Sequence, residues 1–255
     1  MAFNCVAGMN SESQRQAELR QRLERVQAQI AEAALRVNRK PQDITLVAVS
    51  KTHSAETIRQ AIAAAVSDLG ENRVQEAESK ILEVGRNAAR WHLIGHLQSN
   101  KARRAVELFD VIHSLDSVAL AQRLDRVCEE VNREVLPVLI QVDLGQEATK
   151  SGAAEDQIEK IVDVIKGCPR LSLKGLMTLP PYFDDPQQTR PYFRRLRELR
   201  DDLFGQGAFG NQGGELSMGM THDFAVAIEE GATIVRVGTA IFGERVSEPP
   251  AVAGS

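Results

Sequence analysis

The stretch LVAVSKTHS, residues 46–54, joins an apolar run to a lysine and then to a short polar segment. Val47 and Val49 are β-branched, which favours a buried strand. Ser54 belongs to the residue types that commonly cap the start of a helix. The stretch therefore predicts a strand, a loop and a helix in succession, which is the repeating unit of parallel α/β folds.

The same unit recurs along the chain. Eight apolar runs are strand candidates, and each of the first seven precedes a segment with the apolar spacing of a helix. We therefore predict one domain over residues 1–255, a single (β/α)8 TIM-type barrel at about 44–243 followed by a short flexible C-terminal tail. The predicted strands are 44–50, 68–72, 91–97, 111–116, 135–144, 173–179, 216–220 and 233–242.

A long amphipathic helix is predicted before the barrel, over about residues 11–40, with Pro41 ending it. A dimerising coiled coil is one interpretation of its apolar stripe. We favour a helix lying across the outside of the barrel, because the repeat is short and rich in alanine. The stripe consists of Leu19, Leu23, Val26, Ile30, Ala34 and Val37.

Composition narrows the class of ligand. The net charge of -4 and the pI near 5.8 argue against a protein whose main partner is nucleic acid. No apolar run approaches the roughly 18 residues of a membrane span, and the N-terminus lacks the pattern of a secretory signal. The three cysteines are an odd number without paired metal-ligand spacing, which suits reduced thiols. We therefore expect a cytoplasmic protein that binds a small metabolite and no metal.

Lys51 follows the first predicted strand, at the end where barrel enzymes carry their active sites. Side chains alternate along a strand, so Lys51 shares a face with Val47 and Val49. If that face is the inner one, partial desolvation favours the neutral amine, which can form an imine with a carbonyl compound. On this stretch alone, a solvated lysine at the start of a loop is the alternative.

The last two strands end in small residues that carry hydrogen-bond donors. Gly238 and Thr239 end the eighth, and Ser217 and Gly219 end the seventh. Barrel enzymes often hold a phosphate after these two strands, where backbone amides and hydroxyls can surround an anion. The pattern predicts a phosphate site.

Arg236 lies inside the otherwise apolar eighth strand, so an inward-facing guanidinium needs an acceptor. The carboxylates of Asp143 and Glu71 are two candidates, and a ring nitrogen of a bound cofactor is a third. An aldehyde for Lys51, a phosphate for the glycine turn and a pyridine nitrogen for Arg236 are combined in one molecule, pyridoxal 5′-phosphate.

Other polar residues near strand ends are weaker candidates. Glu71 and Asn72 close the second strand and could line the cofactor pocket, although capping the next helix is an alternative role. His92 and His96 share one face of the third predicted strand. Because no third ligand is apparent, we interpret them as hydrogen-bonded histidines near the barrel mouth and not as a metal site.

Nearly the whole barrel resembles the YggS/PROSC family, the pyridoxal phosphate homeostasis proteins. The last matching stretch is close to diagnostic of that family. The matching stretches are AVSK (48–51), LGENRVQEAESK (69–80), WHLIGHLQSNK (91–101), VLIQVDLGQEATKSG (138–152), GLMTLPP (175–181) and LSMGMTHDFAVAIEEGATIVRVGTAIFG (216–243).

The resemblance implies a barrel like the N-terminal domain of alanine racemase, with Lys51 carrying the cofactor as an internal aldimine. It implies that Arg236 faces the pyridine nitrogen. The implied cofactor-binding residues are Lys51, Asn72, Ser217, Arg236, Gly238 and Thr239. Family members are regarded as carriers that regulate supply of the cofactor, which makes pyridoxal phosphate-dependent apoenzymes candidate recipients.

We expect little or no turnover of amino acids. An arginine at the pyridine nitrogen leaves the ring a poor electron sink. Racemases of similar fold use a tyrosine from a second domain, which we do not expect here, and the only tyrosines are Tyr182 and Tyr192. An amino-acid racemase and a Schiff-base aldolase of sugar phosphates are the alternative functions. We expect a monomer, with a dimer as the alternative.

Overall fold

Eight parallel strands close into a barrel in the computed structural model, which describes the backbone of residues 3–145 and 151–243 and side chains from residue 14 onward. Each strand pairs with its neighbours in sequence, and β8 pairs with β1. The predicted barrel is confirmed. The strands are β1 (Thr45–Val49), β2 (Asp68–Glu71), β3 (Arg90–Leu93), β4 (Val111–Leu115), β5 (Leu136–Val142), β6 (Leu171–Thr178), β7 (Glu215–Ser217) and β8 (Ile234–Val237).

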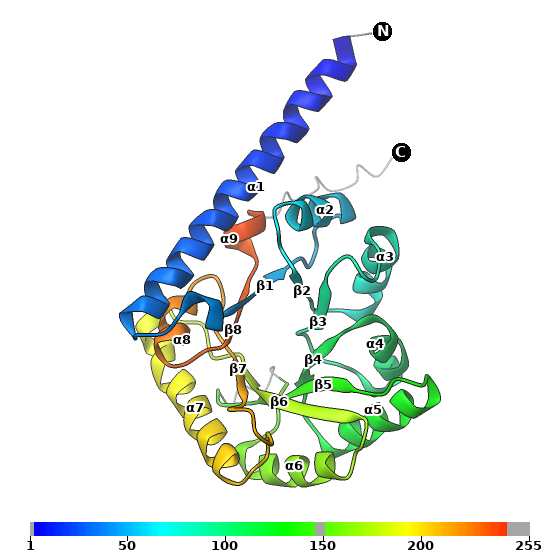
Figure 1. The fold of residues 1–255 in the computed structure, drawn as a ribbon, viewed down its shortest axis with the longest axis vertical. Coiled ribbons are helices and arrows are strands. Elements are labelled where there is room, and N and C mark those ends of the chain that lie inside the picture. Colours follow the sequence, from blue (N-terminus) through cyan, green and yellow to red (C-terminus); the bar gives the residue numbers. More distant parts are fainter. Residues whose placement is uncertain (1–2, 146–150, 244–255) are drawn as a thin grey trace, which may run out of the picture.

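Helices surround the barrel and cover the outer faces of its strands (Figure 1). They are α1 (Phe3–Arg36), α2 (Ala55–Ala63), α3 (Val74–Val84), α4 (Ala102–Leu108), α5 (Val118–Glu130), α6 (Ile158–Lys166), α7 (Arg190–Gly205), α8 (Phe224–Glu229) and α9 (Thr239–Phe242). Short 3-10 helices are η1 (Pro41–Asp43), η2 (Ser99–Lys101), η3 (Glu155–Gln157) and η4 (Pro186–Thr189).

Local capping sets where the first helix after β1 begins. The Ser54 hydroxyl accepts a hydrogen bond from the Thr57 amide at 3.3 Å, as its residue type predicts. Ser117 caps α5 in the same way, through the amide of Leu120. These caps end the loops that follow β1 and β4, and they limit how far each loop can extend over the barrel mouth.

Strands β3, β7 and β8 are shorter than the predicted runs. After β7, Gly219 has a φ of +91°, and a Cβ there would lie 2.6 Å from the Cβ of Ala227. After β8, the chain turns at Gly238 into α9, so residues 239–242 are helical and not extended. His96 lies beyond the end of β3 and therefore does not share a strand face with His92.

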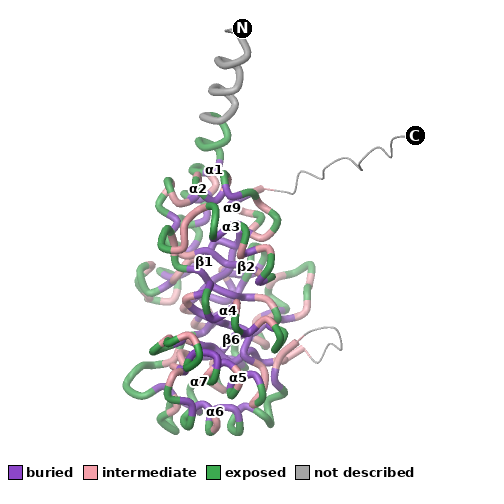
Figure 2. Tube along the Cα trace, turned by 90° about the vertical axis from the view of Figure 1, so that its right-hand side faces the viewer, coloured by how far each residue is buried: buried purple, intermediate pink, exposed green. Residues whose placement is uncertain are grey.

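Helix α1 lies against α8 and α9 on the outside of the barrel and extends beyond it (Figures 1 and 2). Its apolar stripe, including Leu19, Leu23, Val26 and Ile30, is buried there. This is the packing that we favoured over a coiled coil. None of the helices in the described ranges combines the length and apolar character needed to cross a membrane.

The end of α1 comes earlier than predicted, at Arg36 and not near residue 40. Asn38 adopts a left-handed conformation with a φ of 57°, and the Arg39 amide donates to the Ala34 carbonyl at 2.9 Å. This turn satisfies the last helical carbonyls before Pro41 is reached. The predicted C-terminal tail, residues 244–255, lies outside the described residues.

We predict that Leu23→Ala lowers the free energy of unfolding by about 2–5 kcal/mol, because Leu23 is only 2% exposed against the barrel. Leu35→Ala on the same helix is the matched control. Leu35 is 65% exposed, so its substitution is expected to cost less than about 0.5 kcal/mol. Urea denaturation of both variants measures the difference, and equal losses would contradict this packing.

Candidate functional site

Lys51 stands where three neighbouring strands end. Val47 pairs with Asp68 of β2 on one side and with Arg236 of β8 on the other. Beyond the strand, the Ser50 amide donates to the Gly70 carbonyl at 3.0 Å. Lys51 is half-buried, and it follows β1 between the ends of β2 and β8. The register thus brings this lysine to the mouth of the barrel.

Val47 and Val49 show which face of β1 looks inward. Val47 belongs to the apolar cluster inside the barrel. A Cβ on Gly238 would lie 3.4 Å from the Val49 Cβ, so Val49 reaches the strand end of β8. Because alternate residues share a face, the inner face of β1 leads to Lys51, as the sequence requires for an amine at the mouth.

A buried ion pair holds the residue before Lys51. The Lys80 ammonium of α3 donates to the Ser50 carbonyl at 2.8 Å and lies 2.9 Å from Glu71 Oε1. The Ser50 hydroxyl donates to the same carboxylate at 2.6 Å. Glu71 is fully buried, and burial raises its pKa while the Lys80 ammonium opposes the rise. We call Ser50, Glu71, Glu76 and Lys80 the lysine clamp.

The residue after Lys51 is held by the same clamp. The Thr52 amide donates to Glu76 Oε1 at 2.5 Å, and that oxygen also accepts from Lys80 at 2.6 Å. Thr52 has a φ of 67°, a conformation that costs energy in a β-branched residue and needs such support. The backbone is therefore fixed on both sides of Lys51.

Arg236 is 2% exposed, and its guanidinium is fixed by neutral acceptors. Nη1 donates to the Ser217 hydroxyl at 2.5 Å, and Nη2 donates to the Thr178 carbonyl at 2.8 Å. Burial lowers the pKa of Arg236 to about 10, so the group stays charged at neutral pH. Neither of these hydrogen bonds goes to a carboxylate, and Glu71, one of the candidate acceptors, is engaged by Lys80 instead.

The direction in which the Glu71 side chain points explains why it does not pair with Arg236. Gly70 packs its α-carbon toward the side chains of Val47 and Ile94 in the barrel, so the next residue faces the helices. Glu71 accordingly meets Lys80 of α3. It supports the loop that carries Lys51, and it does not line the pocket as the sequence suggested.

Polar side chains continue from Arg236 across the barrel interior. Ser217 Oγ lies 2.9 Å from His113 Nδ1, and His113 Nε2 lies 2.8 Å from His92 Nδ1. His92 Nε2 lies 2.9 Å from Asp68 Oδ1. Burial lowers the pKa of both histidines, that of His113 well below its usual range. We call these five residues the interior chain.

Asn72 presents an unpaired polar atom at the end of β2. Its side-chain oxygen is buried, and among the described residues it has no hydrogen-bond partner. A Cβ on Gly95 would overlap the Asn72 carbonyl oxygen, so glycine lets the loop after β3 pack closely on this backbone. Buried amides rarely lack a partner, which makes this atom a candidate contact for a ligand.

The turn after β8 completes the mouth. Gly238 accepts from the amides of Ile241 and Phe242 at 2.9 and 3.0 Å, and Thr239 is exposed at the start of α9. The His53 ring, in the loop after Lys51, stacks on Phe242 at 4.8 Å. The loop that carries the amine and the turn at Gly238 are therefore in direct contact.

Four of the predicted residues follow strand ends at the mouth, and the other two, Arg236 and Ser217, are buried just below it and bond to each other. Ser217 is fully buried, with its hydroxyl already engaged by Arg236 and His113. Sequence reasoning missed Lys80 and His113. The only signals for them were the spacing of Glu76 and Lys80, four residues apart on a helix, and a histidine placed within an apolar strand run. The residues that follow strand ends at the mouth are Lys51 after β1, Asn72 after β2, and Gly238 and Thr239 after β8.

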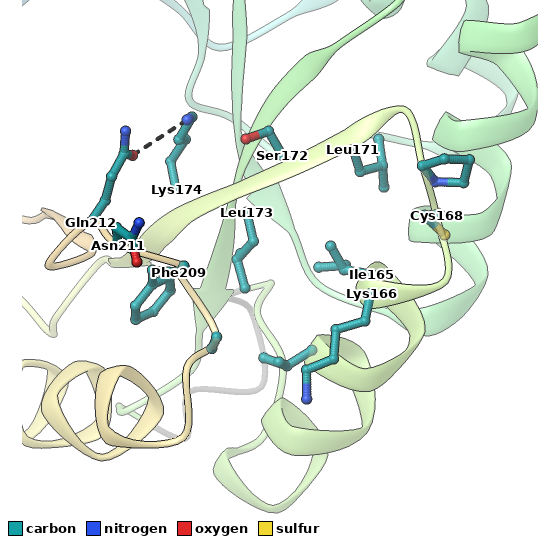
Figure 3. A pocket seen from close by; sticks show the side chains of 14 residues that line it. Ile165, Lys166, Cys168, Leu171, Ser172, Leu173, Lys174, Phe209, Asn211 and Gln212 are labelled. Atoms are coloured by element: carbon teal, nitrogen blue, oxygen red, sulfur yellow. Dashed lines mark hydrogen bonds between the residues drawn. The ribbon is translucent and has the colours of Figure 1, made fainter.

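Another hollow lies at the opposite end of the barrel, where β6 begins (Figure 3). Apolar residues such as Leu171 and Phe209 line it together with polar ones such as Asn211 and Gln212. Lys174 donates to Gln212, Lys166 pairs with Asp163, and the two lysine side chains point away from each other. No convergent set of charges is formed by these described residues.

Comparisons with known proteins identify the family and the fold. Residues 21–246 match the family described as alanine racemase, N-terminal domain. The pyridoxal phosphate homeostasis protein of Aquifex aeolicus is 43% identical over 225 residues, covering 88% of this chain and 97% of the relative. That of Pseudomonas aeruginosa is 42% identical over 228 residues, with coverages of 89% and 96%. The structure of PipY from Synechococcus elongatus with PLP bound has 41% identity and a TM-score of 0.73, covering 84% of this chain and 100% of that one.

We predict that Lys80→Met lowers the free energy of unfolding by about 3–5 kcal/mol, because it leaves the Glu71 carboxylate buried without its cation. Adding Glu71→Gln should recover part of this loss. Lys166→Met is the matched control, since Lys166 forms an exposed pair worth less than about 1 kcal/mol. Urea denaturation measures all three, and a loss no larger than the control's would show that the clamp is not stabilising.

We predict that stability falls as the pH drops below about 6.5. Burial lowers the pKa of His92 and His113 from the ordinary 6.5, so the folded state keeps them neutral where the unfolded state binds protons. Their contribution is complete above pH 6.5 and is lost as the pH falls toward the folded-state values. His113→Asn should flatten the dependence of the urea midpoint on pH, whereas His222→Asn, at an exposed histidine, should not. An unchanged slope in His113→Asn would contradict the assignment.

Proposed function

Because this chain belongs to the family of pyridoxal phosphate homeostasis proteins, and its barrel to the alanine racemase N-terminal domain family, we propose that it binds pyridoxal 5′-phosphate at the barrel mouth. One observation carries the proposal. A half-buried amine that follows β1 lies beside the paired strand β8, which carries a fixed guanidinium and ends at a glycine turn.

Lys51 is the proposed attachment residue. Pyridoxal phosphate supplies an aldehyde, which condenses with a lysine amine with loss of water and can be passed on to another amine. The lysine clamp supports this role, because it fixes the backbone on both sides of Lys51 while leaving its side chain out of the ion pairs. A fixed backbone lowers the entropy lost when the amine is tethered to a ligand.

Arg236 is the proposed contact of the pyridine nitrogen. A guanidinium has five N–H donors, and the two hydrogen bonds to Ser217 and Thr178 leave others for a ligand. A guanidinium offers no acceptor, so it suits an unprotonated ring nitrogen. That nitrogen withdraws electrons poorly, which supports binding and transfer of the cofactor with little turnover of amino acids.

Gly238 and Thr239 are the proposed phosphate contacts, and Asn72 a further polar contact. A side chain at Gly238 would press on the Val49 carbonyl, 3.3 Å from the Cβ position, so glycine keeps this corner open for a ligand. The side-chain oxygen of Asn72, buried and without a partner among the described residues, supports a ligand group at the end of β2. The Ser217 hydroxyl already bonds to His113 and Arg236. In this proposal Ser217 therefore acts on the cofactor through Arg236 and not through a phosphate contact of its own.

The proposed role is that of a cytoplasmic carrier that supplies pyridoxal phosphate to apoenzymes. Neither tyrosine supports the racemase alternative, because Tyr182 is 74% exposed beside His222 and Tyr192 stacks on Phe183. The free thiols of Cys128 and Cys168 are compatible with a reducing compartment. A monomer is supported by α1, whose apolar stripe is already used against the barrel.

We predict that borohydride reduction of the loaded protein fixes the cofactor on the peptide that contains Lys51. Lys51→Ala should abolish this label and the visible absorption of the bound cofactor, because imine formation needs that amine. Lys166→Ala is the control and should keep both. A label on another lysine, or an undiminished label in Lys51→Ala, would overturn the assignment. Deuterium exchange from solvent into the α-carbon of alanine would instead favour a racemase.

A further inference from the structure

The interior chain occupies one polar layer of an otherwise apolar barrel. Val111 and Ile234 belong to the apolar cluster that fills the interior. His113 and Arg236 follow them by two residues on the same strands, so they face inward one layer closer to the mouth. Neither is more than 2% exposed, so their hydrogen bonds must be satisfied within the protein.

The direction of the hydrogen bonds follows from the Asp68 end. Hydrogen bonds from His92 and Ser67 outweigh burial and lower the pKa of Asp68, so its carboxylate is ionised and can only accept. His92 therefore donates from Nε2. A neutral imidazole carries one proton, so His92 Nδ1 is an acceptor, and His113 must donate to it from Nε2.

The remaining links point the same way. With its proton on Nε2, His113 accepts at Nδ1 from the Ser217 hydroxyl, and that hydroxyl oxygen accepts from Arg236. The reverse direction would set a lone pair of His92 against the carboxylate. It would also aim two N–H groups at Ser217 Oγ and leave the hydroxyl proton without an acceptor. One arrangement alone satisfies every group.

We propose that Asp68, His92 and His113 are positioning residues that hold Arg236 in place through this one-way chain of hydrogen bonds. The chain thereby sets the orientation in which the Arg236 guanidinium meets the cofactor ring. The expected effect of these residues on cofactor binding rests on the proposed function. The chain runs from a cation at the mouth to an anion at the start of β2, and it joins residues of five different strands: Asp68, His92, His113, Ser217 and Arg236.

The arrangement accounts for a buried arginine whose hydrogen bonds within the described ranges go to neutral groups, while Asp223 acts on it through charge alone. Hydrogen bonds that point in one direction polarise one another, so the Asp68 charge strengthens the acceptor at Ser217 Oγ. Together with the Thr178 carbonyl, that acceptor fixes two corners of the guanidinium plane. The remaining N–H groups are then held in one orientation before any ligand arrives, which lowers the cost of binding.

The direct test is nitrogen NMR of the ligand-free wild-type protein labelled with 15N-histidine, with signals assigned from His92→Gln and His113→Gln spectra. At pH 7, both imidazoles are expected to be neutral with the proton on Nε2. A proton on Nδ1 of either ring, or a charged ring, would overturn the proposed direction. This measurement needs no cofactor and no altered protein beyond the assignment variants.

The consequence is tested by pyridoxal phosphate binding to three variants. Asp68→Leu removes the terminal acceptor and should weaken binding about fivefold, the effect of one lost hydrogen bond. Asp68→Asn keeps an oxygen that accepts from His92 and should bind within about twofold of wild type. Asp163→Leu, at an exposed aspartate paired with Lys166, is the control and should bind as wild type does.

Equal binding by Asp68→Leu and wild type would overturn the positioning role, as would equal weakening in Asp68→Leu and Asp68→Asn. Circular dichroism of each variant checks that the barrel remains folded. If wild type itself fails to bind pyridoxal phosphate, the proposed function is wrong, and the NMR result still decides whether the chain has the stated direction.

Discussion

The pairing of β8 with β1 is the constraint on which the site depends. It closes the barrel and sets Val47 beside Arg236, so that the lysine following β1 stands next to the turn following β8. These segments belong to the first and the last strand of the barrel. Neither segment forms the site by itself. Lys51 and Arg236 become neighbours only when β8 pairs with β1 and closes the sheet.

Two buried polar clusters then fix the mouth from opposite sides of the sheet. The lysine clamp lies between the barrel and α3, and it holds the backbone around Lys51. The interior chain lies within the barrel and holds Arg236. Buried charges are costly unless they are paired and hydrogen-bonded. The charges of the lysine clamp are paired with one another, and the Arg236 charge is hydrogen-bonded to Ser217 and Thr178. Apolar residues of similar volume often replace buried polar clusters without loss of stability. We therefore infer that these two clusters serve the arrangement of the site more than the stability of the fold.

Sequence patterns were sufficient to locate all eight strands, because strand-like runs recur along the chain and the first seven each precede a segment with helical spacing. They failed at the ends of β7 and β8, where Gly219 and Gly238 turn the chain before the apolar run is over. The alternation of side chains predicted that Arg236 shares a face with Ile234 and Gly238, but it could not identify the acceptors of Arg236. Ser217 and Thr178 are distant in sequence, and the same holds for the contact between Lys80 and Ser50. Such pairings depend on register across a closed sheet, which no local pattern encodes.

The most direct measurement is a crystal structure of this chain grown with pyridoxal 5′-phosphate. The account predicts electron density continuous with Lys51 Nζ, a ring nitrogen within hydrogen-bond distance of Arg236, and the phosphate against Gly238 and Thr239. Arg236 should keep its contacts with Ser217 and Thr178. Cofactor bound elsewhere, or at the mouth with Arg236 turned away from the ring, would contradict the central claim.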